Sequence, residues 1–253
     1  MNSIARKQRI LQELQEKGNV SIVDMAEAIG VSSMTIRRDL KKLSNEGLVT
    51  LEYGGAVLNS GSLFEYNMAM KEREFADEKN RIARKCLEYI NEGDSVYLDS
   101  GTTPAELAKL ISNKRNIVVL SHSLLVANVM SKYPNVKFIM CPGVFRERSM
   151  AYMGQMTDDF VSHFKIDKFF MSIEGIDPAT GLSVPDYSDG ETKRNILVNS
   201  DVIIVMVDSS KFGKKFFYNI APLTSVDAVV TDKGVSDEDV RMIKDHSIRV
   251  DVV

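Results

Sequence analysis

Residues 31–43 read VSSMTIRRDLKKL, and this stretch decides the fold of the first part of the chain. Ser32 is a residue type that caps helices, and the apolar residues Ile36, Leu40 and Leu43 then recur at i, i+4 and i+7. A glycine shortly after the last of them ends the pattern. The spacing therefore predicts a short helix with one buried face and a polar face that carries several cations.

Two shorter helices are predicted before this one. The first carries Ile10, Leu11 and Leu14 on one face. The second follows the capping residue Ser21 and ends at Gly30. The three helices are separated by short breaks, which is typical of a small helical domain with a tight turn between its last two helices.

The residues after the third helix predict a hairpin and then a change of pattern. Residues 48–58 read LVTLEYGGAVL, two strand-like runs on either side of a Gly-Gly pair. Three helices and a hairpin make a winged helix-turn-helix, which we assign to residues 1–58. The aperiodic residues 59–76 predict a linker, and residues 77–253 predict a second domain.

The second domain is predicted to be an α/β domain with a mostly parallel sheet. Its apolar runs are rich in Val and Ile and are separated mostly by helical stretches. The runs span residues 95–98, 117–120, 136–140, 168–173, 202–207, 227–231 and 248–253. Nearly continuous apolar strands suit a sheet that is covered on both faces.

The composition indicates that any affinity for nucleic acid must come from a local basic surface. The 253 residues include 32 Lys plus Arg and 35 Asp plus Glu, so no global field attracts an anionic partner. Cys86 and Cys141 have unrelated surroundings, and we find neither a secretory signal nor a membrane-spanning run. We therefore expect a cytoplasmic protein without membrane contact, and with neither a metal nor a cofactor.

The polar face of the third helix predicts contact with DNA. In a helix-turn-helix the second helix of the pair enters the major groove, where hydroxyls and arginines reach base edges and lysines reach phosphates. The residues placed for this are Ser33, Thr35, Arg37, Arg38, Lys41 and Lys42. Asp39 is the only acid among them, and Arg6, Lys7 and Arg9 at the start of the first helix are expected to extend the basic face.

The sequence VSIVDMAEAIGVSSMTIRRDLKKLSNEGLVTLEYGGA, residues 20–56, resembles the N-terminal domain of the DeoR (GlpR-like) transcriptional regulators. The shared features are T-I-R-R-D-L and the Gly-Gly-Ala of the wing. The resemblance continues through nearly the whole chain, in D-x-G-T-T at residues 99–103 and D-S-S-K-F-G at residues 208–213. It implies a cytoplasmic repressor, often of sugar catabolism, that is released from DNA by a phosphorylated sugar. We expect a homodimer, or a tetramer formed as a dimer of dimers, on double-stranded operator DNA.

Polar segments follow four of the predicted strands, where ligands bind in an open α/β sheet. The residues that we assign to effector binding are Asp99, Gly101, Thr102, Thr103, Ser121, His122, Arg146, Glu191, Lys193 and Lys211. In the first segment the hydroxyls and amides suit a phosphate, with Thr103 as the N-cap and Pro104 as the first helical residue. Asp99 suits a sugar hydroxyl instead.

Each of these assignments has a structural alternative. Gly-Thr-Thr-Pro also suits a capped turn without a ligand, and a lone His122 is often a satisfied structural residue. Arg146 also suits an exposed loop, and Lys211 suits a salt bridge with Asp208 or Glu191. A redox sensor that uses one of the two cysteines is a weaker interpretation.

The second domain is also similar to ribose-5-phosphate isomerase, and so to an isomerase/CoA-transferase-like fold. Glu174, Asp177, Glu191 and residues 208–211 follow the order of its motifs. Sugar isomerisation needs a base, for which Glu191 is suited, and an electrophile. The resemblance places the electrophile on a lysine in a glycine-rich loop, but residues 182–189 contain no lysine and no glycine. We expect a sugar-phosphate pocket without catalysis, with a DNA-binding isomerase as the alternative.

Overall fold

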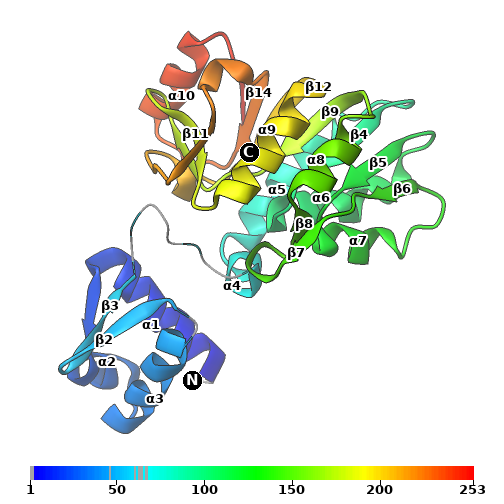
Figure 1. Cartoon of the computed structure of the whole chain (residues 1–253). Helices are drawn as coiled ribbons and strands as arrows, with labels where there is room; N and C mark the ends of the chain where they lie inside the picture. The colour runs from blue at the N-terminus through cyan, green and yellow to red at the C-terminus, as the bar shows by residue number, and fades with distance from the viewer. Residues whose placement is uncertain (1–2, 46, 60, 62–64, 66–67) are drawn as a thin grey trace. The chain divides into compact units, whose positions relative to one another are not determined.

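The computed structural model describes residues 3–45, 47–59, 61, 65 and 68–253, and it divides the chain into two compact units, residues 1–66 and 67–253 (Figure 1). Part of the stretch assigned to a linker lies outside the described residues. The described part of that stretch includes the helix α4, Met68–Arg73, which belongs to the second unit.

The first unit contains the helices and the hairpin that the sequence predicts. Its described elements are α1 (Ser3–Lys17), β1 (Asn19–Ser21), α2 (Ile22–Ile29), α3 (Ser33–Asn45), β2 (Val49–Glu52) and β3 (Gly55–Leu58). Ser32 Oγ accepts a hydrogen bond from the Thr35 amide at 3.2 Å, as expected of a helix cap. The strand β1 was not predicted, and it pairs antiparallel with β3.

The two glycines of the wing have different roles. Gly54 lies in the turn between β2 and β3 with φ 79°, a conformation that glycine adopts without strain. Gly55 begins β3, and a Cβ atom there would lie 2.1 Å from the carbonyl oxygen of Val20 in β1. The turn requires the first glycine, and the close approach of β1 requires the second.

A buried ion pair joins α1 to α3. Arg6 Nε donates to Asp39 Oδ2 at 2.5 Å, and the two side chains are 9% and 1% exposed. The prediction that Arg6 extends the basic face is wrong, because its guanidinium lies inside the unit beside Asp39. The pair compensates the charge of the one acid on α3, so all the exposed charges of that helix are positive.

The second unit is built on a seven-stranded sheet in which every neighbouring pair of strands is parallel. In the order β15-β14-β12-β9-β4-β5-β6, the strands are Arg249–Val252, Ala228–Thr231, Ser200–Met206, Ile166–Met171, Ser95–Leu98, Val118–Ser121 and Lys137–Met140. Each strand corresponds to one predicted apolar run, so the predicted parallel α/β domain is confirmed.

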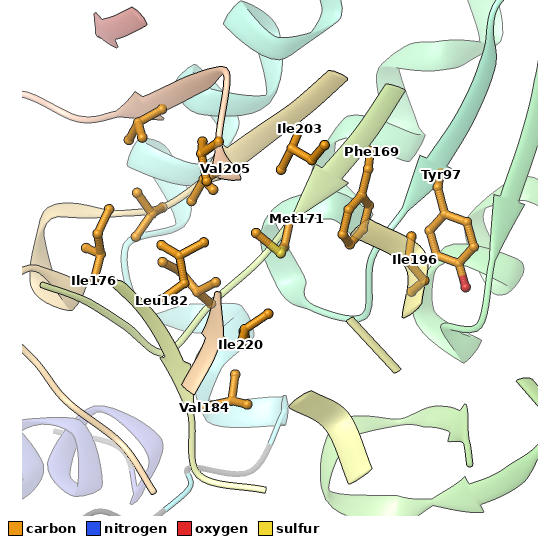
Figure 2. Packing of buried hydrophobic residues seen from close by; sticks show 14 of the residues in the cluster. Tyr97, Phe169, Met171, Ile176, Leu182, Val184, Ile196, Ile203, Val205 and Ile220 are labelled. Carbon is orange, nitrogen blue, oxygen red and sulfur yellow. The ribbon is translucent and has the colours of Figure 1, made fainter. Parts of the chain in front are cut away.

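Helices cover both faces of this sheet (Figure 1). One face packs against α5 (Ala76–Leu87), α6 (Thr102–Leu110) and α7 (Leu124–Met130), and the other against α8 (Gln155–Val161), α9 (Tyr187–Val198) and α10 (Asp237–Asp245). Successive strand residues alternate between the two cores, so Phe169 and Val205 lie on the α9 side and Phe170 on the α6 side. Figure 2 shows the α9-side core.

Short elements that the sequence did not predict extend the second unit. The hairpin is formed by β7 (Val144–Arg146) and β8 (Ala151–Met153), and a small antiparallel sheet by β10 (Gly175–Asp177), β11 (Gly181–Val184) and β13 (Tyr218–Ala221). The 3-10 helices are η1 (Ile111–Asn113), η2 (Glu147–Ser149), η3 (Ser209–Lys211) and η4 (Leu223–Ser225).

Two kinds of feature are absent from the described part of the chain. None of its helices combines the length and the apolar character needed to cross a membrane. Nor do those residues include a group of three or more His, Cys, Asp or Glu side chains placed to hold a metal ion.

We predict that Asp39→Ala destabilises the first unit by about 3 to 5 kcal/mol, because it leaves the buried Arg6 guanidinium without its carboxylate. Urea unfolding followed by circular dichroism measures the loss. Replacing both partners, as Arg6→Met with Asp39→Leu, should recover most of it. Glu27→Gln, at an exposed position on α2, is the control. Unfolding of Asp39→Ala at the wild-type urea concentration would contradict a stabilising pair.

Candidate DNA-binding surface and effector site

The helix α3 presents an exposed row of polar and basic side chains. Ser33, Arg37, Arg38, Lys41 and Lys42 are exposed, and Thr35 is half-buried. Residues 30–32 form the turn that joins α2 to α3. Since Asp39 is buried against α1, the exposed face combines four positive charges with a hydroxyl near the start of the helix. This is the arrangement that reaches phosphates and base edges in a major groove.

The strand order of the second unit reverses between β4 and β9, the position at which open α/β sheets have their ligand-binding crevice. The chain runs from β4 outward to β5 and β6, returns to β9, and then runs outward the other way to β12, β14 and β15. Ligands of open α/β sheets bind at the carboxyl ends of the strands where the order reverses in this way. The residues that follow β4 and β9 are therefore the centre of the candidate effector site.

Asp99 follows β4 and is completely buried at this crevice. Its Oδ1 accepts from the Ser100 amide at 2.7 Å, and its Oδ2 accepts from the Ser172 amide at 2.8 Å and from Lys193 Nζ at 2.6 Å. Lys193 also lies 3.4 Å from Asp189 Oδ1. Burial lowers the pKa of Lys193, but Asp189 and Asp99 outweigh that effect and raise it above its usual value. Asp99 thus fastens β4, β9 and α9 together.

The Gly-Thr-Thr turn leads directly into α6, which begins two residues earlier than predicted. Gly101 is the N-cap and Thr102 the first helical residue, so the prediction of Thr103 as N-cap and Pro104 as first residue is wrong. Pro104 is tolerated because the first amides of a helix have no partner within the helix. A Cβ atom on Gly101 would lie 2.7 Å from Ser172 Oγ, so this close approach requires glycine.

His122 follows β5, lies next to Asp99 and is completely buried. Its Nδ1 is 3.0 Å from the Tyr97 hydroxyl, and its Nε2 is 3.8 Å from Asp99 Oδ1. Among the described residues, Nε2 has no hydrogen-bond partner. Burial lowers the pKa of His122 to about 4, so the ring is neutral at pH 7. Ser121, also buried, accepts from the Ser123 amide at 3.0 Å.

The buried thiols do not support a redox sensor. Burial raises the pKa of Cys141 to about 11 and raises the pKa of Cys86 further. Both groups therefore stay protonated at neutral pH, and the thiol is a poor nucleophile compared with the thiolate. Cys141 lies 3.5 Å from the Tyr97 hydroxyl, which donates to its sulfur.

A second charged cluster lies after β9 and β12. Lys211 Nζ donates to Glu174 Oε2 at 2.9 Å, and Lys71 of α4 donates to Glu174 Oε1. Burial raises the pKa of Glu174, but Lys211 and Lys71 outweigh it and hold that pKa well below its usual range. The alternative that Lys211 forms a salt bridge is therefore realised, although with Glu174 and not with Asp208 or Glu191.

The remaining two predicted site residues have protein partners at the start of α9 and beside it. Arg146 of β7 lies 3.2 Å from Asp186 Oδ2 and donates to Ser149 Oγ at 3.2 Å. Glu191 accepts a hydrogen bond from the Tyr218 hydroxyl.

Sequence reasoning missed residues of both clusters, among them Ser172, Tyr97 and Lys71. Ser172 has no distinguishing pattern, and Tyr97 reads as an ordinary apolar position of a buried strand. Lys71 falls in the stretch assigned to a linker, where the lack of periodicity gave no reason to expect a contact with the sheet. No sequence pattern shows the strand order of the folded sheet, which brings the ends of β4 and β9 together and places Ser172 beside Asp99.

The exposed cations of α3 and the polar crevice of the sheet define a winged helix-turn-helix regulator with an α/β sensor domain. Residues 6–62 match the model of the DeoR-like helix-turn-helix domain, and residues 74–233 match that of the DeoR C terminal sensor domain. The chain belongs to the DeoR family of transcriptional regulators.

Curated relatives align over almost the whole chain. The glycerol-3-phosphate regulon repressor of Escherichia coli K12 is 34% identical over 254 residues, covering 100% of both chains. The lactose phosphotransferase system repressor of Staphylococcus epidermidis is 31% identical over 239 residues, covering 92% of this chain and 94% of its own. Both are named as repressors and not as enzymes.

A more distant likeness links the second unit to solved structures of sugar-phosphate isomerases. The ribose 5-phosphate isomerase A of Methanocaldococcus jannaschii superposes with a TM-score of 0.41 and 14% identity, over 55% of each chain. A likeness at this level is too distant to bear on activity.

We predict that His122 makes the stability of the second unit fall in mild acid. Its pKa is about 4 in the folded state against 6.5 ordinarily, so the unfolded chain takes up the proton first as the pH falls. The contribution is complete above pH 6.5 and is lost between pH 6.5 and pH 4, roughly 3 kcal/mol in all. Urea unfolding at pH 7 and pH 4 measures it by comparing the wild type with His122→Gln.

The variant should lose less stability than the wild type over this range. The exposed His246→Gln should follow the wild type. Equal pH dependence of the wild type and His122→Gln would show that the buried ring does not resist protonation.

Proposed function

We propose that this protein is a repressor that binds operator DNA through α3 and is released when a phosphorylated sugar binds at the β4/β9 crevice. The exposed basic face of α3, from which the only acid has been withdrawn, is the observation that carries the DNA-binding part. We further propose a homodimer or a dimer of dimers, because two recognition helices on neighbouring half-sites match an inverted repeat.

On α3, Ser33, Thr35, Arg37 and Arg38 lie toward the N-terminal end and would reach base edges. Lys41 and Lys42 lie nearer the C-terminal end and would contact phosphates. The two groups differ in what they contribute, since contacts to bases give sequence preference and contacts to phosphates give salt-dependent affinity.

For the effector, the start of α6 offers amide groups and the positive end of a helix dipole, which favour a phosphate. Thr102, Thr103 and Lys211 would hold the phosphate, while Ser121 and His122 would select the rest of the molecule. Asp99 would act by holding Lys193 in place, because its oxygens already accept protein donors. Arg146 and Glu191 would contribute from the edge of the site. The names of the two relatives, a glycerol-3-phosphate regulon and a phosphotransferase system, support an effector of this chemistry.

Release of DNA requires that the effector bind one arrangement of the protein more tightly than the other, since equal affinity shifts no equilibrium. Such an effector need not be chemically changed. The isomerase alternative is disfavoured because Lys193, the lysine that pairs with Asp99, is held between Asp99 and Asp189. An ammonium fixed by two carboxylates is a poor electrophile for an enediolate.

We predict that Arg37→Ala with Arg38→Ala weakens operator binding by at least about tenfold, the expected effect of losing one or two arginine contacts to base edges. The operator is first selected from random-sequence DNA with the wild-type protein, and fluorescence anisotropy then gives the affinities. Lys165→Ala with Lys244→Ala removes the same charge from exposed positions of the second unit and should have little effect. Unchanged operator affinity in a folded Arg37, Arg38 variant would exclude α3 as the recognition helix.

We also predict that a phosphorylated sugar raises the unfolding temperature of the full chain, whereas the same sugar without its phosphate does not. Binding at a hundredfold excess over Kd contributes about 2.7 kcal/mol, which corresponds to a rise of several degrees. A thermal-shift screen over pentose, hexose and triose phosphates identifies the effector. If no phosphorylated sugar stabilises the protein, the effector assignment is wrong. Isomerisation of any of them, lost on Glu191→Gln, would contradict a sensor without turnover.

A further inference from the structure

Glu174 bridges two lysines that come from distant parts of the chain. Its Oε2 accepts from Lys211, which follows β12, and its Oε1 accepts from Lys71 on α4. The side chains of Glu174, Lys211 and Lys71 are 18%, 19% and 10% exposed. The bridge is therefore largely withdrawn from water and yet reachable from it.

Positive charge is in excess around this bridge. Lys79 and Lys214 both lie near Lys211, and their pKa values are lowered by burial first, with the charge of Lys211 lowering them further. Asp208, Glu74 and Glu174 itself are the nearby acids that oppose this effect. Of the described side chains around the bridge, four lysines (Lys71, Lys79, Lys211 and Lys214) thus face three acids, so a further negative charge would be stabilised here.

The carboxylate of Glu174 is chemically similar to the phosphate group of the proposed effector. A carboxylate and a phosphate monoester both accept charge-assisted hydrogen bonds from ammonium groups. The phosphate brings more acceptor oxygens and more charge, so it gains more from a site with excess lysines. Glu174 also lies between β9 and β10, and so follows one of the two strands at whose ends we place the effector.

We propose that the anionic group of the effector displaces the carboxylate of Glu174 from between Lys71 and Lys211. Glu174 then acts as an internal competitor that occupies the anion position until the effector arrives. This inference rests on the proposed function, since it concerns the same effector, and it adds Lys71 to the groups that bind it.

The exchange would change what holds α4. The carbonyl oxygen of Lys71 accepts from Lys79 Nζ and lies 3.5 Å from Thr102 Oγ1 in the Gly-Thr-Thr turn, so α4 is attached to the site by backbone and side chain. Lys79 Nζ also donates to the Glu74 carbonyl at 2.6 Å. Effector binding would therefore change the contacts of α4, which is the first helix after the DNA-binding unit along the chain.

Inorganic phosphate is the probe that tests this exchange, because it has the anion but no sugar hydroxyls. The affinity of the full chain for phosphate is measured by isothermal titration calorimetry. Glu174→Gln removes the competing charge, and Glu174→Asp keeps the charge but shortens the side chain so that it no longer bridges both lysines. We expect both variants to bind phosphate at least about tenfold more tightly than the wild type, the equivalent of one charge-assisted hydrogen bond.

Removing a cation should have the opposite effect. Lys71→Met keeps the apolar stem and should bind phosphate about tenfold more weakly than the wild type. Glu78→Gln and Lys165→Met alter exposed ion pairs elsewhere in the same unit and should leave the affinity unchanged. If Glu174→Gln does not fold because two lysines lose their carboxylate, Glu174→Asp still decides the question.

Phosphate affinity that is unchanged or weaker in the folded Glu174 variants would overturn the proposal. If Glu174 instead accepts a hydrogen bond from a sugar hydroxyl, its variants should bind sugar phosphates more weakly and inorganic phosphate as the wild type does. If the wild type binds sugar phosphates but the Glu174 variants do not bind inorganic phosphate more tightly, the exchange is wrong and the proposed effector still stands. If neither the wild type nor any variant binds phosphate or a sugar phosphate, the proposed effector is wrong as well.

Discussion

The buried ion pair between Asp99 and Lys193 is the interaction on which the candidate effector site depends. A buried charge is tolerated only where a partner and further hydrogen bonds compensate it. Asp99 meets this condition by accepting from Lys193, from the Ser172 amide and from the Ser100 amide at once. These donors lie on α9, after β9 and after β4, so one carboxylate fixes the walls of the crevice in which a ligand would bind.

The same rule of compensation explains how a chain with net charge −3 can present two places suited to anions. In the first unit, Asp39 is buried in an ion pair with Arg6, and the cations of α3 remain exposed. In the second unit, a cluster of lysines is held around a single bridging carboxylate, that of Glu174. Global charge does not predict either place, because each depends on which acids are buried beside which bases.

Most of the fold could be predicted because burial on both sides leaves a continuous apolar signal. The seven strands of the central sheet are covered by helices, and all seven were recognised as apolar runs. The strands β7, β8, β10, β11 and β13 lie outside that sheet and, except for β8, contain no apolar run of more than two residues, so their pattern does not distinguish them from loops. Strand β1 was missed for the same reason.

The sequence by itself determined the three helices of the first unit, the wing, the central strands and the polar residues that follow those strands, because these depend on local periodicity and backbone conformation. The tertiary structure alone decided the partners of the charged residues. It placed Arg6 against Asp39, Lys193 against Asp99, and Lys71 with Lys211 around Glu174. Coulomb energy and desolvation depend on distances between groups that are far apart in the chain, and only the folded arrangement of strands and helices sets those distances.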